Sequence, residues 1–393
     1  MRQIAYVSED GQIRVRDLDV ERDVEISHDE SGLNEAWACG WPTWSPDGER
    51  LAYFRYEVAN GKISGTSVCV AVADGQGDVQ TVRPSSGGLI YMAWSPDCRR
   101  IAVLVQEGNR LLLRVIDTHG DGPPLTVAQG APLYFTWLPD SLGLVVHLGM
   151  EGLVGPTSRI VWVRLESGTS TQTPLAAEPA VSFRAPCWSR VLLGATAALE
   201  ENEGTRIILQ TDATDPAETL CGAGPAPAFS WSPDGSTLAI SSRRDSSGHD
   251  YGGLSVYAAA SREQLRVIDN PILAFFWCPD SRRILYTTGE AGARMVRFRT
   301  LDIVSRETLD LGWLRPTRDL LLLQGHFDQY AQSAHLFSPA GDELVLAASR
   351  AKEAENGSVP TVRQLLIRML GGDAAEQVIG RGRLAFWRPT AIL

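Results

Sequence analysis

A repeat built around Trp-Ser-Pro-Asp constrains this chain more than any other feature of its sequence. It is clearest in PTWSPDGERLAYF, from Pro42 to Phe54. Close copies are MAWSPDCRRIAVLV from Met92, FTWLPDSLGLVVHL from Phe135, FSWSPDGSTLAISS from Phe229 and FFWCPDSRRILYTT from Phe275. Weaker copies begin at Ala185 and His335, and the half-copy LAFWRPTAIL ends the chain. The repeat therefore extends over nearly the whole sequence.

Each copy predicts a β-hairpin. The apolar run that ends in Trp is typical of a buried strand. Ser-Pro-Asp-Gly is typical of a tight turn, because Pro presets φ, Asp bonds its own backbone and Gly accepts a positive φ. The run that follows, such as LAYF or IAVLV, is apolar and too short for a helix, so it predicts a second strand.

The spacing of the repeats predicts the architecture. The aromatic anchors lie 43 to 60 residues apart, at Trp44, Trp94, Trp137, Trp188, Trp231, Trp277, Phe337 and Trp387. An all-β repeat of about this length is typical of a β-propeller, with one four-stranded blade per repeat. Eight anchors predict a single β-propeller of eight four-stranded blades. Ser-Arg-Val replaces Ser-Pro-Asp after Trp188, and if that segment is not a blade the ring has seven.

The two ends of the chain complement each other. Residues Ile4 to Ser8 match the second strand of the later repeats, whereas Leu384 to Arg388 match a first strand with no blade after it. We therefore expect one blade to be split between residues 1–30 and 381–393, so that the C-terminal strand closes the ring and removes open sheet edges. Residues 1–393 then form one domain.

One blade is irregular. The anchors Trp277 and Phe337 are 60 residues apart, and the excess lies in GWLRPTRDLLLLQGHFDQYAQSA, from Gly312 to Ala334. The apolar run in RDLLLLQGH predicts a long fourth strand, and FDQYAQS is expected to lead into the next first strand. We expect a lengthened edge and loop here, not a second domain.

Composition narrows the classes of partner. The net charge of −11 disfavours nucleic acid and anionic membrane, since both need a basic footprint on the protein. No apolar run approaches the roughly 18 residues of a membrane span. The N-terminus has no basic-then-apolar signal pattern, and the six cysteines are scattered without a CxxC pair. These features favour a cytoplasmic protein with reduced, structural thiols.

The repeat sorts the loops between two faces. The Ser-Pro-Asp-Gly turns join first to second strands and are expected on one face, together with the turns between third and fourth strands. Connections between second and third strands, and between blades, are expected on the other face. That second set is long and irregular, as in RYEVANGKISGTS and RRDSSGHDYGG. Function is usually carried by variable loops on a rigid scaffold, so we expect it on this upper face.

With the WSPDG unit followed by a short apolar strand, the chain resembles the WD-like β-propellers of the TolB type. The same repeat occurs in the propeller domains of prolyl-oligopeptidase-like proteins. The resemblance covers nearly the whole chain and implies the propeller fold. TolB proteins carry an extra α/β domain, and the peptidases carry a hydrolase domain; this sequence has neither pattern. The resemblance therefore implies neither the Tol–Pal role nor peptidase activity.

A search for catalytic motifs finds none of the common ones. The serine-hydrolase elbow GxSxG, the Walker loop, HExxH and the EF-hand loop are all missing from the sequence. The six histidines lack metal-ligand spacing. The repeated Asp residues of the turns form an acidic series, but they are turn formers. We therefore expect no catalytic residue, no metal and no cofactor.

Three stretches stand out as candidate sites on the upper face. The first, from Glu35 to Trp44, offers Trp37 and Trp41 either as an aromatic anchor for a partner or as a loop covering its own blade. The second is a charged loop that holds Arg243, Arg244, His249 and Tyr251. It is either a binding rim or a solvated loop.

The third candidate stretch, from Gly325 to His335, is expected near the mouth of the central channel. Its side chains His326, Asp328 and Tyr330, together with His335, form either a polar site or a buried hydrogen-bond network. We expect a non-enzymatic scaffold or interaction module that binds a protein or peptide partner through the upper face. The alternative is an enzyme of the lactonase, lyase or cyclase type with its site at the channel mouth.

Overall fold

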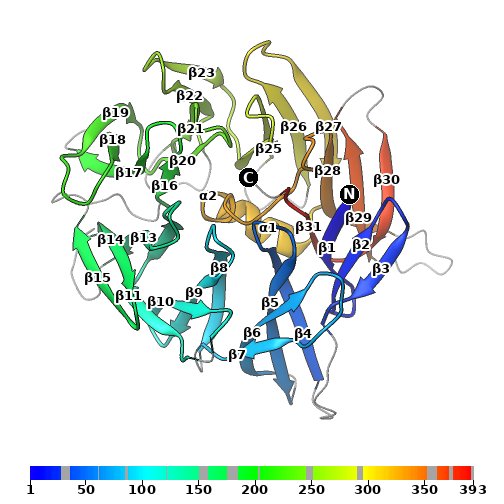
Figure 1. The fold of residues 1–393 in the computed structure, drawn as a ribbon. Helices are drawn as coiled ribbons and strands as arrows, with labels where there is room; N and C mark the ends of the chain where they lie inside the picture. The colour runs from blue at the N-terminus through cyan, green and yellow to red at the C-terminus, as the bar shows by residue number, and fades with distance from the viewer. Residues whose placement is uncertain are drawn as a thin grey trace.

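The computed structural model describes residues 1–27, 36–60, 62–84, 87–120, 122–149, 158–174, 185–201, 204–244, 251–289, 295–351, 361–370 and 375–390. These residues form 31 strands and two helices. The strands make eight antiparallel sheets, arranged as the blades of a propeller around a common axis (Figure 1). The predicted all-β fold with eight blades is confirmed, and the segment around Trp188 is one of the blades.

The split blade and the next three blades occupy the first half of the ring. The split blade consists of β31 (Leu384–Trp387), β1 (Gln3–Val7), β2 (Ile13–Asp17) and β3 (Arg22–Glu25). The following blades consist of β4 (Ala36–Trp44), β5 (Arg50–Ala59), β6 (Lys62–Val72) and β7 (Gln80–Val82); β8 (Gly88–Trp94), β9 (Arg100–Glu107), β10 (Arg110–Asp117) and β11 (Leu125–Gly130); and β12 (Leu133–Trp137), β13 (Gly143–Gly149), β14 (Ser158–Glu166) and β15 (Thr169–Pro174).

The other four blades complete the ring. They consist of β16 (Cys187–Ser189), β17 (Gly194–Glu201), β18 (Gly204–Gln210) and β19 (Glu218–Ala223); β20 (Ala228–Trp231), β21 (Thr237–Ser241), β22 (Leu254–Ala258) and β23 (Gln264–Ile268); β24 (Ala274–Trp277), β25 (Arg283–Thr288), β26 (Val296–Asp302) and β27 (Thr308–Leu314); and β28 (Glu343–Ala351), β29 (Thr361–Met369) and β30 (Glu376–Arg381). The two helices are α1 (Arg318–Gly325) and α2 (Phe327–Tyr330).

The ring closes through the chain ends, as predicted. Strand β31 pairs antiparallel with β1, from Ile4 opposite Trp387 to Val7 opposite Leu384. Hydrogen bonds from Arg383 N to Val7 O (2.8 Å) and from Arg388 N to Gln3 O (2.9 Å) extend the ladder at both ends. The C-terminal strand is therefore the innermost strand of the blade that begins the chain.

The repeat tryptophans fasten neighbouring blades together. The indole N–H of Trp94 donates to Thr43 O in the preceding blade (3.0 Å), and that of Trp137 donates to Ala93 O (3.1 Å). Trp44 donates in the same way to Phe386 O (3.2 Å), across the junction between the two chain ends. Trp277 donates to Ser230 O (3.0 Å). The first-strand Trp therefore packs between blades and also donates a hydrogen bond to the preceding blade.

The Ser-Pro-Asp-Gly turns are locally satisfied structures. In the first of them, Ser45 Oγ donates to Asp47 Oδ1 (2.5 Å) and accepts from Arg50 N (2.9 Å), while Gly48 adopts φ 71°. The turns also bond to one another around the ring. For example, Asp97 N donates to Ser141 Oγ (2.9 Å), and Arg100 Nη1 donates to Ser141 O (3.0 Å). This lower face is thus a repetitive, self-bonded surface.

The irregular segment differs from the prediction. RDLLLLQGH was predicted as a strand, but residues 318–325 form the helix α1, and the fourth strand of that blade is β27, which comes earlier in the chain. The reason is local. Thr317 caps the helix, because its side chain accepts a hydrogen bond from Leu320 N (3.3 Å). Leu320, Leu323 and Gln324, spaced three and four residues apart, form the buried face of the helix. A run of four leucines is compatible with the residue period of a helix and with that of a strand.

The blade that follows α2 has a reduced inner edge. The structure assigns it three strands, β28 to β30, and its expected first strand at Phe337 is a single bridge to Leu344. In the part of the chain that the structure describes, no helix is long and apolar enough to cross a membrane.

Candidate functional site

Residues 317–334, which include both helices, form a central plug. The plug leaves the ring after β27 and lies across its centre, where the innermost strands of the blades converge (Figure 1). Its side chains Leu323 and Phe327 are fully buried. The plug is part of the same chain, so its own side chains occupy the centre of the ring.

Amide side chains of the plug bond to an inner strand on another blade. Gln329 Nε2 donates to Phe135 O (3.0 Å), and Gln329 Oε1 accepts from Phe135 N (3.1 Å). Gln332 Nε2 donates to the same carbonyl (3.1 Å), and Gln332 Oε1 accepts from Thr136 Oγ1 (3.0 Å). Gln329 thus bonds both the N–H and the carbonyl of Phe135, as a neighbouring strand would. Hydrogen bonds as well as packing therefore hold the plug in place.

Aromatic side chains fix the plug to opposite parts of the ring. Phe327 packs against Tyr251 and Phe275, with ring centroids 5.5 and 4.8 Å apart. Tyr330 stacks on Trp41 at 4.8 Å and meets Tyr91 edge-on at 5.0 Å. The Tyr330 hydroxyl donates to Ile90 O (3.3 Å). The two plug rings therefore pack against aromatic side chains of four different blades.

The third candidate stretch, apart from His335, lies within the plug. Tyr330 is buried, with 9% of its surface exposed. Asp328 Oδ2 accepts from Ala185 N at 3.4 Å, and burial lowers the pKa of His335 to about 4. His326 is exposed between the helices. Asp328 and Tyr330 belong to a structural network at the ring centre.

The tryptophans of the first candidate stretch lie in strand β4, not in a loop. Trp41 has φ 54° at an irregularity of the β4–β5 pairing and packs on the plug through Tyr330. Trp37 lies farther along the strand, half-buried, with the Arg55 guanidinium over its ring at 4.9 Å. The two tryptophans therefore lie in different surroundings. Trp41 faces the plug at the ring centre, whereas Trp37 packs against Arg55 of strand β5.

The second candidate stretch lies only partly within the described residues. Arg243 and Tyr251 are brought together as an isolated bridge between two parts of the connection from β21 to β22. Arg244 is exposed, and His249 lies outside the described residues. Arg243 N donates to Pro225 O in the link from the preceding blade (2.9 Å). The backbone at Arg243 is therefore anchored between two blades.

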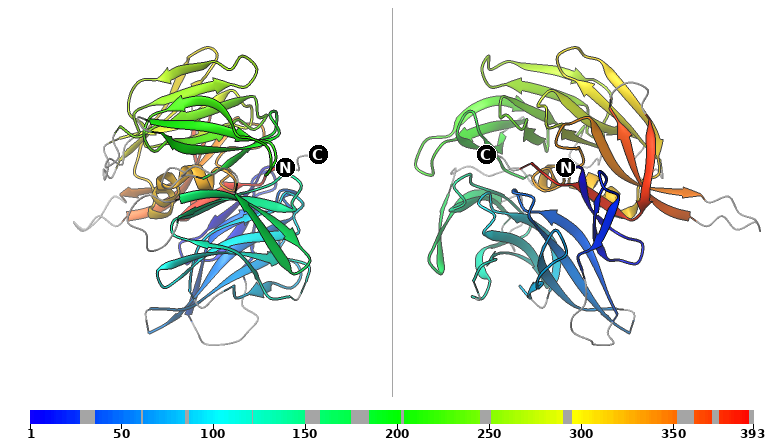
Figure 2. Two further views of the ribbon diagram at one scale, coloured as in Figure 1. Left: turned by 90° about the vertical axis from the view of Figure 1, so that its left-hand side faces the viewer. Right: turned by 45° about the vertical axis from the view of Figure 1, so that its right-hand side comes forward.

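Two long hairpins rise from the upper face. The hairpin of β5 and β6 and the pair β28 and β29 extend to the same side of the ring, which the left-hand view of Figure 2 shows edge-on. The tip of the first hairpin carries the exposed Ile63. Between the hairpins, helix α1 exposes Leu321 and Leu322, at 41% and 46% of their surfaces. The upper face thus exposes two leucines of the plug beside the two hairpins.

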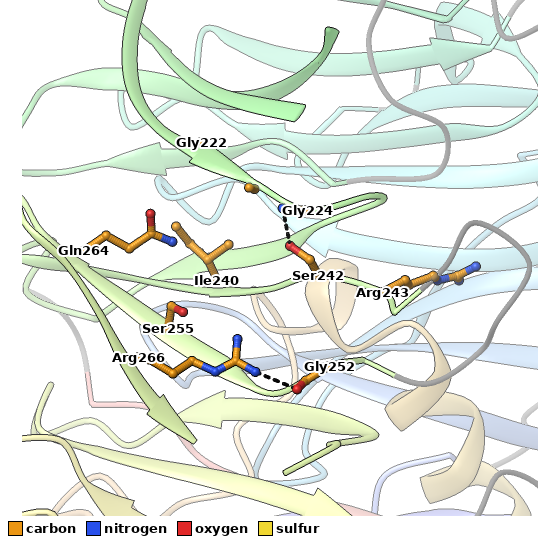
Figure 3. Close-up of a pocket in the computed structure, with 10 residues that line it drawn as sticks. Gly222, Gly224, Ile240, Ser242, Arg243, Gly252, Ser255, Gln264 and Arg266 are labelled. Atoms are coloured by element: carbon orange, nitrogen blue, oxygen red, sulfur yellow. Dashed lines mark hydrogen bonds between the residues drawn. The ribbon is translucent and has the colours of Figure 1, made fainter. Parts of the chain in front are cut away.

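A cleft of about 450 Å³ lies on the same face, between the outer strand β19 and the blade β20–β23 (Figure 3). Its residues are Gly222, Ala223, Gly224, Ile240, Ser242, Arg243, Gly252, Ser255, Gln264 and Arg266. Sequence analysis identified only Arg243 of this set. Arg266 and Gln264 lie in an ordinary-looking fourth strand, and nothing in their sequence indicates that they face a neighbouring blade.

Ionisable groups elsewhere have structural surroundings. Within the described residues, no cluster of three or more metal-ligating side chains occurs. Burial raises the pKa of the Cys221 and Cys98 thiols to about 11 and that of Cys278 to about 12, and all six cysteines are unpaired. These thiols remain protonated at neutral pH, which makes them poor nucleophiles.

Comparison with known proteins shows the fold but no family. No family model and no curated protein matches the sequence. A solved structure of a eukaryotic initiation factor is similar at 13% identity and a TM-score of 0.57, over 100% of both chains. An oligogalacturonate lyase in complex with manganese is similar at 13% identity and a TM-score of 0.53, over 93% of this chain and 96% of that one.

The predicted resemblance is found among the similar structures. One of two prolyl endopeptidases matches at 12% identity and a TM-score of 0.51, over 91% of this chain and 51% of that one. TolB from Acinetobacter baumannii matches at 16% identity and a TM-score of 0.41, over 90% of this chain and 83% of that one. The similar proteins include enzymes and non-enzymes, and at these identities the likeness concerns the propeller fold alone.

Proposed function

We propose that this chain is a non-enzymatic interaction module that binds a protein or peptide partner through its upper face. The central plug is the observation that carries this proposal. The plug directs its amides and aromatic rings into the protein's own ring and turns Leu321 and Leu322 outward. An apolar patch surrounded by polar, raised walls is the usual anatomy of a docking surface.

The walls supply the groups that would select a partner. Trp37, backed by Arg55, offers a large ring held by packing, and aromatic residues of this kind often dominate binding energies. On the other side of the face, Arg243 and the exposed Arg244 supply positive charge. Neither arginine makes an ion pair within the described residues. Unpaired rim charges favour association with an acidic partner.

The rival function, an enzyme with its site at the channel mouth, needs catalytic groups that reach a substrate there. His326, Asp328, Tyr330 and His335 are the candidates for such groups. His326 is exposed between the helices, and burial lowers the pKa of His335 to about 4. Asp328 and Tyr330 both bond to the backbone of neighbouring blades. The ring of Tyr330 is also covered by Trp41. The plug itself stands where such a substrate would enter. These contacts favour the binding role over lactonase, lyase or cyclase chemistry.

A cytoplasmic location is part of the proposal. Cys39 and Cys69 are buried, and burial raises the pKa of both thiols. Six unpaired cysteines suit a reducing compartment, where thiols persist without a framework of disulfides.

Affinity purification from the native host tests the proposed function. The tagged wild type is compared with three upper-face variants: Trp37→Ala, Leu321→Asp combined with Leu322→Asp, and Arg243→Glu combined with Arg244→Glu. Arg99→Gln is the matched control, since Arg99 is exposed in a turn of the opposite face. A specific co-purifying protein should be lost from the three variants and kept by the control, with thermal unfolding unchanged in all four.

Two results would contradict the proposal. A partner that is lost with Arg99→Gln but retained by all upper-face variants would place binding on the turn face. Turnover of a small molecule that disappears in Asp328→Asn, with the fold intact, would favour the rival enzymatic function.

A further inference from the structure

The cleft beside Arg243 lies between two blades on the upper face. One wall is the end of strand β19, where Gly222 and Gly224 leave the backbone uncovered. A side chain placed at Gly222 would meet nothing within 4 Å, so this wall is open. The floor and the other wall come from the next blade, with Ile240, Ser255 and Gln264 side by side (Figure 3).

The charge of the cleft is opposite to that of the protein. The chain carries a net charge of −11, yet among the described residues two arginines and no carboxylate line the cleft. The Arg266 guanidinium is oriented by a hydrogen bond from Nη2 to Gly252 O (2.6 Å). Arg266 Nε forms an ion pair with Asp269 at 3.7 Å, but the Asp269 side chain is 95% exposed. Such a solvated pair neutralises little of the arginine's charge.

Several hydrogen-bond donors of the cleft are unused. Arg243 Nε is buried and has no partner within the described residues. The side chains of Ser255 and Gln264 likewise make no hydrogen bond to the described part of the chain. Gln264 is exposed and Ser255 half-buried, so their amide and hydroxyl groups can donate to a ligand that enters the cleft. The ligand that these groups suit is an anion rich in oxygen acceptors.

We propose that the cleft binds carboxylate side chains from an acidic, extended segment of the partner protein. This inference rests on the proposed function and names the chemistry of one part of the binding face. Arg266 would receive a carboxylate, since charge-assisted bonds to guanidinium groups are stronger than neutral ones, while Arg243 adds positive charge at the edge of the cleft. Ile240 in the floor contacts the methylene groups of Asp or Glu. The open wall at Gly222 leaves room for a peptide backbone.

Binding of a fluorescently labelled oligo-glutamate peptide tests the inference directly. Fluorescence anisotropy should show saturable binding to the full-length wild type, weakened by added salt. Arg266→Gln should weaken it about ten-fold, because it removes a charge-assisted hydrogen bond, and Arg243→Gln should weaken it less, because it removes only a charge at the edge. Arg99→Gln removes the same charge from the opposite face and should leave the affinity unchanged. Oligo-glutamine of equal length should not bind.

Other outcomes overturn the inference. Equal weakening by Arg99→Gln would mean that the peptide responds to overall charge. Inorganic phosphate that displaces the peptide and binds more tightly than it would assign the cleft to a small anion instead. The inference and the proposed function can be told apart. If Trp37→Ala abolishes capture of the partner while Arg266→Gln changes neither partner capture nor peptide binding, the proposed function stands. The acidic-segment inference is then wrong.

Discussion

At the scale of single residues, the repeat tryptophan explains why the sequence is so informative about this fold. Its ring completes the core between blades, and its indole N–H reaches a carbonyl of the preceding inner strand, as Trp94 does with Thr43. Sequence analysis predicts the buried ring from periodicity. It cannot predict the acceptor, which lies on another repeat. Trp387 shows that the bond is separable from burial, because its Nε1 is buried without a partner.

The hydrogen bond of the repeat tryptophan should be measurable by comparing two identical substitutions. Trp94→Phe removes the donor to the Thr43 carbonyl, whereas Trp387→Phe loses similar volume but no bond to the described residues. We expect Trp94→Phe to lower the free energy of unfolding by about 1–2 kcal/mol more than Trp387→Phe. Urea denaturation of both variants provides the measurement. Equal midpoints would show that the indole bond adds nothing to packing.

At the scale of elements, the plug is the part of the fold that sequence analysis assigned wrongly. Four successive leucines fit a strand as well as a helix, and the deciding signals are the cap at Thr317 and the tertiary setting of α1. That setting depends on contacts such as Gln329 with Phe135, 194 positions apart in the chain. Such distant pairings leave no local pattern in one sequence. The candidate residues Asp328 and Tyr330 were found, but their contacts were not predictable.

The plug should lose stability when its glutamine bonds are removed. Gln329→Ala leaves the buried N–H of Phe135 without its acceptor, while the Phe135 carbonyl keeps the bond from Gln332. We expect a cost of about 2–3 kcal/mol, as for a buried polar group left unsatisfied. Leu322→Ala, on the exposed side of the plug, should change stability by less than about 0.5 kcal/mol. Thermal unfolding monitored by tryptophan fluorescence distinguishes the two; similar shifts would mean that the glutamine bonds do not hold the plug.

At the scale of the whole molecule, the repeat predicts what is local and periodic, and misses what lies between repeats. The blade number, the closure through the termini and the sorting of loops by face all follow from hairpins of known handedness and length. The cleft between β19 and the next blade does not, because Arg266 and Gly222 become neighbours only when two blades pack side by side. A binding face of this kind is a property of the assembled ring.

Closure of the ring gives the sharpest test at this scale. Deleting Arg383 to Leu393 removes β31, so β1 loses its inner partner and Trp44 loses its acceptor at Phe386 O. The exposed edge of β1 and the opened core should give aggregated or strongly destabilised protein. The matched control is a permutant that joins the two chain ends by a short linker and opens at Asp269, in the exposed link between β23 and β24. Since β31 and β1 are then continuous, the permutant should melt as the wild type does. Wild-type melting of the deletion variant in differential scanning calorimetry would refute closure, because a ring that does not depend on β31 cannot be held by it.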